Sequence, residues 1–113
     1  NQFSPDEEFK SYVKLIDIGR LNNYSAQQKN ILMRYGIPNT IINRHSASKP
    51  YEVWHYYKIG NLTNIKFIFA DDKNDMLLLH SNMPCELHNA DWRKQLFGSD
   101  AIPIDDAEIF QVF

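Results

Sequence analysis

The sequence lacks most of the features that would identify a chemistry. Its single cysteine, Cys85, excludes a disulfide within the chain. No apolar run exceeds about five residues, which is far too short for a helical membrane span. The 12 basic and 14 acidic residues give a net charge of −2, so the positive charge that nucleic-acid binding requires is missing. No charged and then apolar leader opens the chain, so we expect any signal or lipid anchor to lie outside this segment.

Metal-binding motifs are missing too. The four histidines have neither the His-x-x-x-His nor the His-Glu-x-x-His spacing of zinc sites, and there is no cysteine pair. The acidic stretch Asp71–Asp75 lacks the glycine and the closing glutamate of a calcium loop, so it is better explained as a solvated turn. We therefore expect neither a metal nor a cofactor.

A thiol enzyme is the one catalytic alternative that the residues leave open. Cys85 lies three residues before His88, and His80 precedes both. A thiolate nucleophile needs a nearby base. Catalytic pairs usually come from distant parts of a chain, however, so a plain half-buried cysteine is the simpler interpretation. We predict no catalytic residue, and Cys85, His88 and His80 are the candidates if the protein is a hydrolase.

Length and composition favour one domain over residues 1–113. Of these residues 43% are hydrophobic and 13% aromatic, enough to bury a core without disulfides or metals. The chain starts in polar sequence and ends in the apolar run Ile109–Phe113, so we expect a fragment of a longer protein.

Two helices are predicted before the first long strand. Apolar side chains recur at helical spacing from Pro5 to about Leu21. A second, short helix begins at Ser25, which has the capping-box spacing to Gln28, and ends at Gly36.

Strands are predicted in the rest of the chain. Tyr51–Ile59 is the densest in aromatic and β-branched residues, and Asn64–Ala70 and Met76–His80 follow it. The weaker predictions are a short edge strand at Thr40–Ile42, a loop at Arg44–Pro50, turns at Gly60-Asn61 and Asp71–Asp75, a short helix or irregular segment at Ala90–Phe97, and a last strand at Glu108–Phe113. The predicted fold class is α+β, with two N-terminal helices, a small antiparallel β-meander of three to four strands, and an irregular C-terminal segment.

The predicted sheet has too much apolar surface for one core. In the strand 51–59 both faces carry large apolar side chains, whereas an antiparallel sheet usually turns one polar face to water. Either residues 102–113 or a partner protein must cover the second face. In the second case the candidate interface lies on one face of that strand and consists of Trp54, Tyr56, Glu52 and Lys58.

Five short runs occur along the chain in a fixed order. They are Tyr35-Gly36-Ile37-Pro38, Pro50–Tyr57, Phe67–Asp71, Leu78–Ser81 and Asn89–Trp92. Together they resemble the GWxTD domain family of Bacteroidota envelope proteins. The naming signature of that family falls on Asn23–Gln27, where Tyr24 stands in the place of Trp and the Gly, Thr and Asp positions differ. At the level of fold, the layout is also similar to the small lipoprotein subunits of β-barrel assembly machines.

The resemblance implies a secreted or lipid-anchored protein of the periplasm or the outer membrane, with envelope proteins such as an outer-membrane complex as partners. The expected function is a non-catalytic protein-binding module or accessory subunit of a bacterial cell-envelope complex. A small-ligand or glycan-binding domain is the first alternative, and a Cys/His hydrolase is the second.

Overall fold

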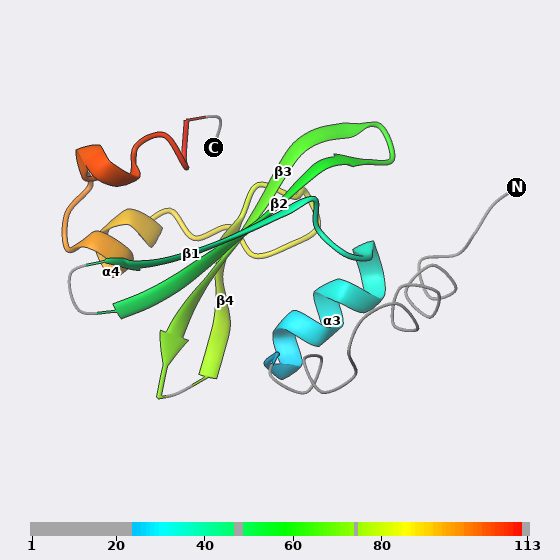
Figure 1. Ribbon diagram of the computed structural model, residues 1–113, viewed down its shortest axis with the longest axis horizontal. Coiled ribbons are helices and arrows are strands. Elements are labelled where there is room, and N and C mark those ends of the chain that lie inside the picture. The colour runs from blue at the N-terminus through cyan, green and yellow to red at the C-terminus, as the bar shows by residue number, and fades with distance from the viewer. Residues whose placement is uncertain (1–23, 47–48, 74, 112–113) are drawn as a thin grey trace, which may run out of the picture.

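The computed structural model describes residues 24–46, 49–73 and 75–111. Their centre is one antiparallel sheet, in which the strands follow each other in the order β1-β2-β3-β4. The sheet is therefore a meander with β1 and β4 at its edges (Figure 1). The strands are β1 (Thr40–Ser46), β2 (Lys49–Ile59), β3 (Leu62–Asp72) and β4 (Asp75–Ser81); helix α3 (Ala26–Tyr35) precedes them, and helix α4 (Trp92–Phe97) and the 3₁₀ helix η1 (Ile104–Asp106) follow.

Helix α3 begins with the predicted capping box. The Ser25 hydroxyl accepts a 3.1 Å bond from the Gln28 backbone N–H, and the Gln28 carboxamide accepts one from the Ser25 N–H. The helix ends at Gly36, which has a φ of 82° and donates its N–H to Leu32 O. Both predicted ends of this helix are therefore confirmed.

The prediction of two N-terminal helices followed by the sheet is wrong. In the described residues only α3 precedes the sheet, and α4 follows it. The first predicted helix, from Pro5 to about Leu21, lies outside the described residues. Helix α4 forms in the segment where the sequence left a short helix or an irregular segment open, because Trp92 and Leu96, four residues apart, both bury against the sheet.

The ends of the predicted strands also need correction. Strand β1 continues beyond Ile42 to Ser46, so part of the predicted loop is strand: Arg44 pairs with Tyr51, and His45 with Pro50. Proline is tolerated there because it lies near the start of β2. The predicted last strand is wrong over residues 108–111, which form successive turns with the Phe110 N–H bonded to Ala107 O. The Gly60-Asn61 turn is confirmed by the pairing of Ile59 with Leu62.

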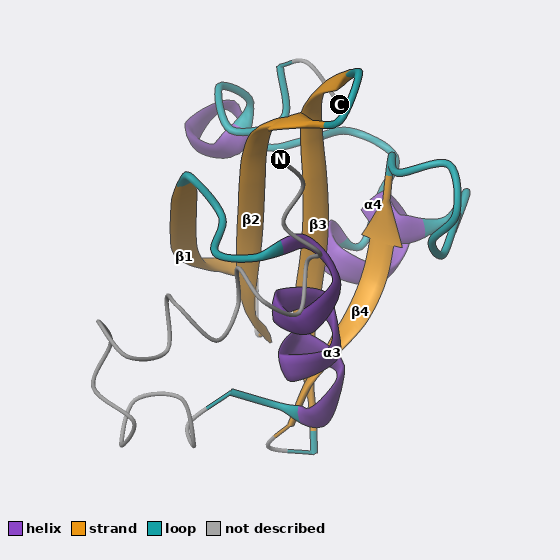
Figure 2. Cartoon of the chain, turned by 90° about the vertical axis from the view of Figure 1, so that its right-hand side faces the viewer, coloured by secondary structure: helices purple, strands orange, loops and turns teal. Residues whose placement is uncertain are grey.

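Apolar layers cover both faces of the sheet. On one face Ile31 and Leu32 of α3 pack in a cluster with Trp54, Phe67 and Phe69. Figure 2 shows α3 in front of the sheet and α4 behind it.

On the opposite face, Trp92 and Leu96 of α4 and Phe110 pack against Tyr51 and Ile68. Residues 65–70 of β3 are consequently all buried, as expected for a strand covered on both faces. The second face of the sheet is thus covered by the chain itself.

Candidate functional site

The aromatic residues of the predicted interface lie in the core. Trp54 is 0% exposed and Tyr56 2% exposed, because α3 packs on the sheet face that they share. The Tyr56 hydroxyl donates a 2.8 Å bond to Gly36 O at the end of that helix. Neither side chain can contact a partner in this fold.

The two polar residues of the predicted interface, Glu52 and Lys58, lie in different environments. The Glu52 carboxylate accepts hydrogen bonds from Trp54 Nε1 (2.9 Å) and from Gln28 Nε2 (3.0 Å), so it joins the sheet to α3. Lys58 is exposed near the β2–β3 turn. Glu52 therefore serves the core, and only Lys58 remains on the surface.

The candidate thiol site is not assembled. Cys85 is exposed rather than half-buried, and in the described part of the chain no interaction joins it to His80 or His88. The His80 ring stacks on Trp92 with 5.7 Å between ring centroids, and its Nδ1 accepts a 2.9 Å bond from the Asn89 N–H.

The electrostatics of His80 agree with this structural role. Burial, and then the nearby His88 and Arg93, lower the pKa of His80. The ring is thereby kept neutral and available as an acceptor for the Asn89 N–H. Over residues 24–46, 49–73 and 75–111, no group of three His, Cys, Asp or Glu side chains is placed to hold a metal ion.

The outer edge of β4 is the more informative surface. The Leu78 N–H donates a 2.6 Å bond to the Gln27 carboxamide of α3, so it points away from β3. Backbone groups of an antiparallel strand alternate in direction, which places those of Met76 on the same outer side. The side chains Met76–His80 are half-buried, and the first four of them are apolar. The edge of β4 therefore combines outward backbone groups with a run of apolar side chains.

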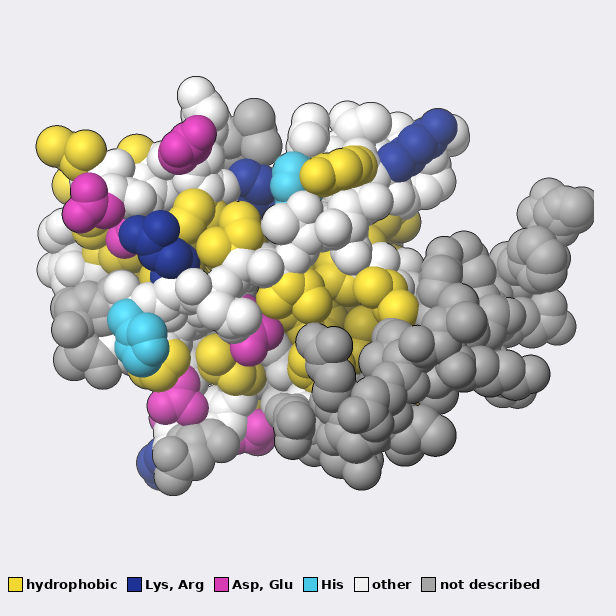
Figure 3. All heavy atoms as spheres, viewed as in Figure 1, with side chains coloured by type: hydrophobic (Ala, Val, Ile, Leu, Met, Phe, Trp, Pro, Cys, Tyr) yellow, Lys and Arg dark blue, Asp and Glu magenta, His cyan; other side chains and the backbone are white. Residues whose placement is uncertain are grey.

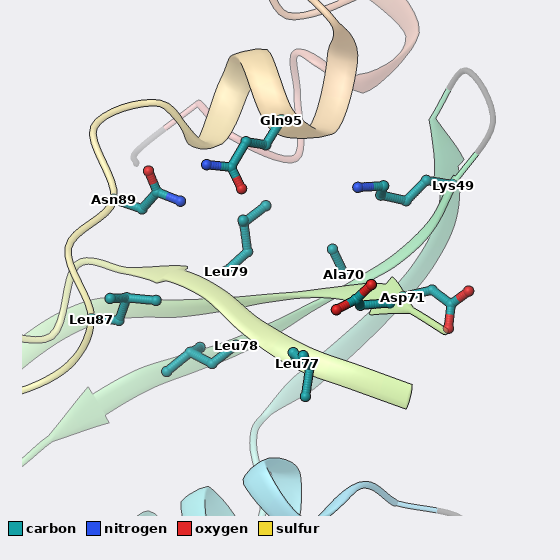
Figure 4. A pocket seen from close by; sticks show the side chains of 10 residues that line it. Lys49, Ala70, Asp71, Leu77, Leu78, Leu79, Leu87, Asn89 and Gln95 are labelled. Atoms are coloured by element: carbon teal, nitrogen blue, oxygen red, sulfur yellow. The ribbon is translucent and has the colours of Figure 1, made fainter. Parts of the chain in front are cut away.

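One hollow lies between this edge and α4, with a volume of about 420 Å³. Leu77, Leu79 and Ala70 form its apolar floor. Figure 4 shows the polar ends of Lys49, Asn89 and Gln95 around the space above β4. We call this the α4-side hollow.

A second hollow, of about 270 Å³, lies between the edge and α3. Gln27, Asn30 and Ile31 line it from the helix, and Glu86 and Leu87 from the loop after β4. We call this the α3-side hollow. Leu78 and Leu87 line both hollows, so the two meet at the edge of β4.

The other sheet edge differs in chemistry. Strand β1 carries Asn43, Arg44 and His45, and Arg44 is ion-paired with Asp106. Polar and charged residues on an edge disfavour pairing with a further strand. Of the two edges, β4 is thus the better suited to accept one. In the sequence the only sign of this edge is the apolar run Met76–Leu79, which predicts a buried strand equally well.

Neither the surface charge nor the helices of the described residues indicate a further binding site. On the face seen in Figure 3, basic and acidic side chains of the described residues are interspersed, in line with the net charge of −2. Within the described part of the chain, α3 has ten residues and α4 six, and neither is long and apolar enough to cross a bilayer.

The comparisons with known proteins give no relative. No family model, no curated protein and no solved structure matches this chain. The resemblance to the GWxTD family and the envelope location accordingly stay predictions from the sequence.

Proposed function

We propose that this chain is a non-catalytic protein-binding domain, which takes an extended segment of a partner protein along the edge of β4. The observation that carries the proposal is the pair of hollows that meet at this edge. In the envelope setting that the family resemblance implies, the partner is another envelope protein.

Strand addition accounts for both hollows. An extended segment that pairs with a sheet edge gains main-chain hydrogen bonds, and its successive side chains point to opposite faces of the sheet. Along β4 these side chains would enter the α4-side and the α3-side hollow in turn. Leu77 and Leu79 face the first of them, while Leu78 packs with the cluster under α3.

The flanking elements favour a single segment as the occupant. Helix α3 and Glu86 and Leu87 of the loop after β4 lie on one side of the edge, and Gln95 of α4 lies on the other. A lone strand needs only the width of one strand, about 4.8 Å. A second sheet with its own helices needs open space on both sides. We therefore assign the edge to an unfolded, extended segment of the partner.

Selection of random heptapeptides displayed on phage tests the proposal. We expect enrichment of sequences with apolar residues at alternate positions. Titration of an enriched peptide into the isotope-labelled chain should shift the amide resonances of Asp75–Ser81 most strongly. No enrichment, or shifts confined to β1, would overturn the proposal.

A matched pair of variants sharpens the test. Leu87 is 48% exposed and lines both hollows, whereas Leu62 is 37% exposed at the β2–β3 turn. Leu87→Glu adds a charge where apolar side chains of the segment would lie, so it should weaken binding at least about tenfold. Leu62→Glu should leave the affinity unchanged, and an equal loss in both variants would argue against the β4 edge.

A small ligand in the α4-side hollow is the second candidate. Its volume of about 420 Å³ falls within the range of ligand pockets, and the polar groups of Lys49, Asn89 and Gln95 surround an apolar floor. In this case a bound compound would shift the resonances of α4 and of Leu77 and Leu79, while those of Gln27 and Asn30 on α3 would stay in place.

A further inference from the structure

Two N–H groups of β4 donate to acceptors outside β3: that of Ser81 bonds to Leu87 O at the end of the strand, and that of Leu78 is covered by Gln27. Its carboxamide oxygen accepts the 2.6 Å bond from the Leu78 N–H, and its side chain is exposed at the start of α3. A carboxamide carries the same acceptor and donor groups as a peptide unit. The side chain thus satisfies the edge in the way that the backbone of an added strand would.

We propose that in the free domain the Gln27 carboxamide occupies the hydrogen-bonding position of the partner's backbone, and that it is displaced when the partner segment binds. This inference rests on the proposed function and names the residue that controls access to the site. In the bound state a backbone carbonyl of the segment accepts the Leu78 N–H, and the Gln27 side chain turns to solvent.

A second carboxamide, that of Asn82, covers backbone groups at the edge of β3 and is held more firmly. Strand β3 continues beyond the end of β4, and Asn82 covers the exposed part. Asn82 Oδ1 accepts a 2.8 Å bond from the Lys66 N–H, and Asn82 Nδ2 donates a 2.9 Å bond to Asn64 O. One carboxamide here satisfies both a donor and an acceptor of the strand edge.

The two covers differ in strength. Asn82 is half-buried, is held by two side-chain bonds, and its backbone N–H also donates to Lys66 O. Gln27 is exposed and makes a single such bond to β4. A long exposed side chain gains conformational freedom when it is released, which offsets part of the lost bond. Gln27 is accordingly the cover that a partner segment can displace.

The same bond has a use in the free protein. An apolar edge strand with open backbone groups pairs readily with other chains. By occupying the Leu78 N–H, Gln27 makes such pairing compete with an existing hydrogen bond. Only a segment that also fills the two hollows offsets that cost, so Gln27 favours specific over unspecific strand addition.

Removing the cover should therefore strengthen binding. In the wild type the segment must first replace the Gln27 bond, which lowers its apparent affinity. In Gln27→Ala the Leu78 N–H is open to the segment. Because the bond is exposed and single, we expect an affinity gain of about threefold to tenfold.

The experiment compares the wild-type chain with Gln27→Ala and Asn30→Ala, using a capped heptapeptide enriched in the display selection. Asn30 is the matched control: it is exposed on the same helix and lines the same hollow, but it makes no hydrogen bond to β4. Two quantities are measured for each protein, the hydrogen-exchange rate of the Leu78 amide in the free domain and the dissociation constant of the peptide.

The inference is supported if Gln27→Ala shows faster exchange of the Leu78 amide and tighter peptide binding, while Asn30→Ala shows neither. Unchanged exchange, or peptide binding by Gln27→Ala that is no tighter than by Asn30→Ala, overturns the inference and leaves the proposed function standing. If no peptide binds to any of the three proteins, the proposed function and this inference fall together.

Discussion

The Arg44 guanidinium on β1 lies 2.5 Å from the Asp106 carboxylate in η1, and it also donates to Asp105 O. The Asp106 side chain is buried, whereas that of Arg44 is partly exposed. Next to the same carboxylate lies buried Tyr51, and burial, followed by the charge of Asp106, raises the pKa of its hydroxyl. This ion pair fastens the C-terminal segment to the sheet face that the segment covers, and Lys66 Nζ adds a bond to Ile109 O.

Arg44→Ala should loosen the C-terminal cover. The substitution leaves a buried carboxylate without its cation, so we expect the free energy of unfolding to fall by about 1–3 kcal/mol. Denaturant titration followed by tryptophan fluorescence measures the loss. Lys94→Ala, an exposed change on α4, serves as the control. Equal stability of the two variants would contradict the role given to the ion pair.

Trp54→Ala should destabilise the whole fold instead of abolishing a surface contact. The ring is fully buried between α3 and the sheet, and removal of such a side chain costs about 3–5 kcal/mol. Tyr57→Ala, at a neighbouring position of β2 that is 56% exposed, should change the free energy of unfolding by less than about 0.5 kcal/mol. Thermal unfolding of both variants by circular dichroism separates the outcomes, and a stable Trp54→Ala protein would restore the interface prediction.

Glu52 offers a test of the junction between α3 and β2. Glu52→Ala leaves Gln28 Nε2 and Trp54 Nε1 without an acceptor, so it should lower the free energy of unfolding by about 1–3 kcal/mol. Glu52→Gln keeps an oxygen at the same place and should lose much less. Chemical denaturation of the pair provides the measurement, and the idea fails if the two variants lose equal stability.

His80 should make the protein less stable in mild acid. Its pKa in the folded state lies below the ordinary value of 6.5, so the folded state binds fewer protons than the unfolded chain. The associated stability is present above pH 6.5 and is lost as the pH falls through the lowered pKa. Burial lowers the pKa of His55 as well, so both residues contribute.

The measurement is the free energy of unfolding between about pH 5 and 8, the range in which histidine titrates. His80→Gln should show a shallower loss on acidification than the wild type. His45→Gln, on the exposed edge strand, is the matched control and should follow the wild type. A wild-type curve that is flat across this range would count against the proposed titration of His80.

Part of the fold follows from neighbouring residues. The capping box of Ser25 and Gln28, the stop at Gly36 and the turn after Ile59 depend on residues a few positions apart, so they were predictable from the chain. Strand β2 was predictable because its aromatic and β-branched residues favour an extended backbone in any surroundings.

The site depended on contacts between distant residues. Whether Trp54 is an interface anchor or a core residue is decided by α3, which lies on it and comes from another part of the chain. The loop predicted around Arg44 became strand because pairing with β2 outweighs the local turn preference of its serines and proline.

The sequence by itself determined the helix between Ser25 and Gly36, the central strand β2 and the two apolar faces of the sheet, because these features follow from local patterns of side chains. Only the tertiary structure decided that α4 and Phe110 cover the second face and that the open edge of β4 lies between two hollows. The physical reason is that burial and edge exposure depend on which elements meet in space. Contacts between residues far apart in the chain connect these elements, such as Arg44 with Asp106 and Gln27 with Leu78.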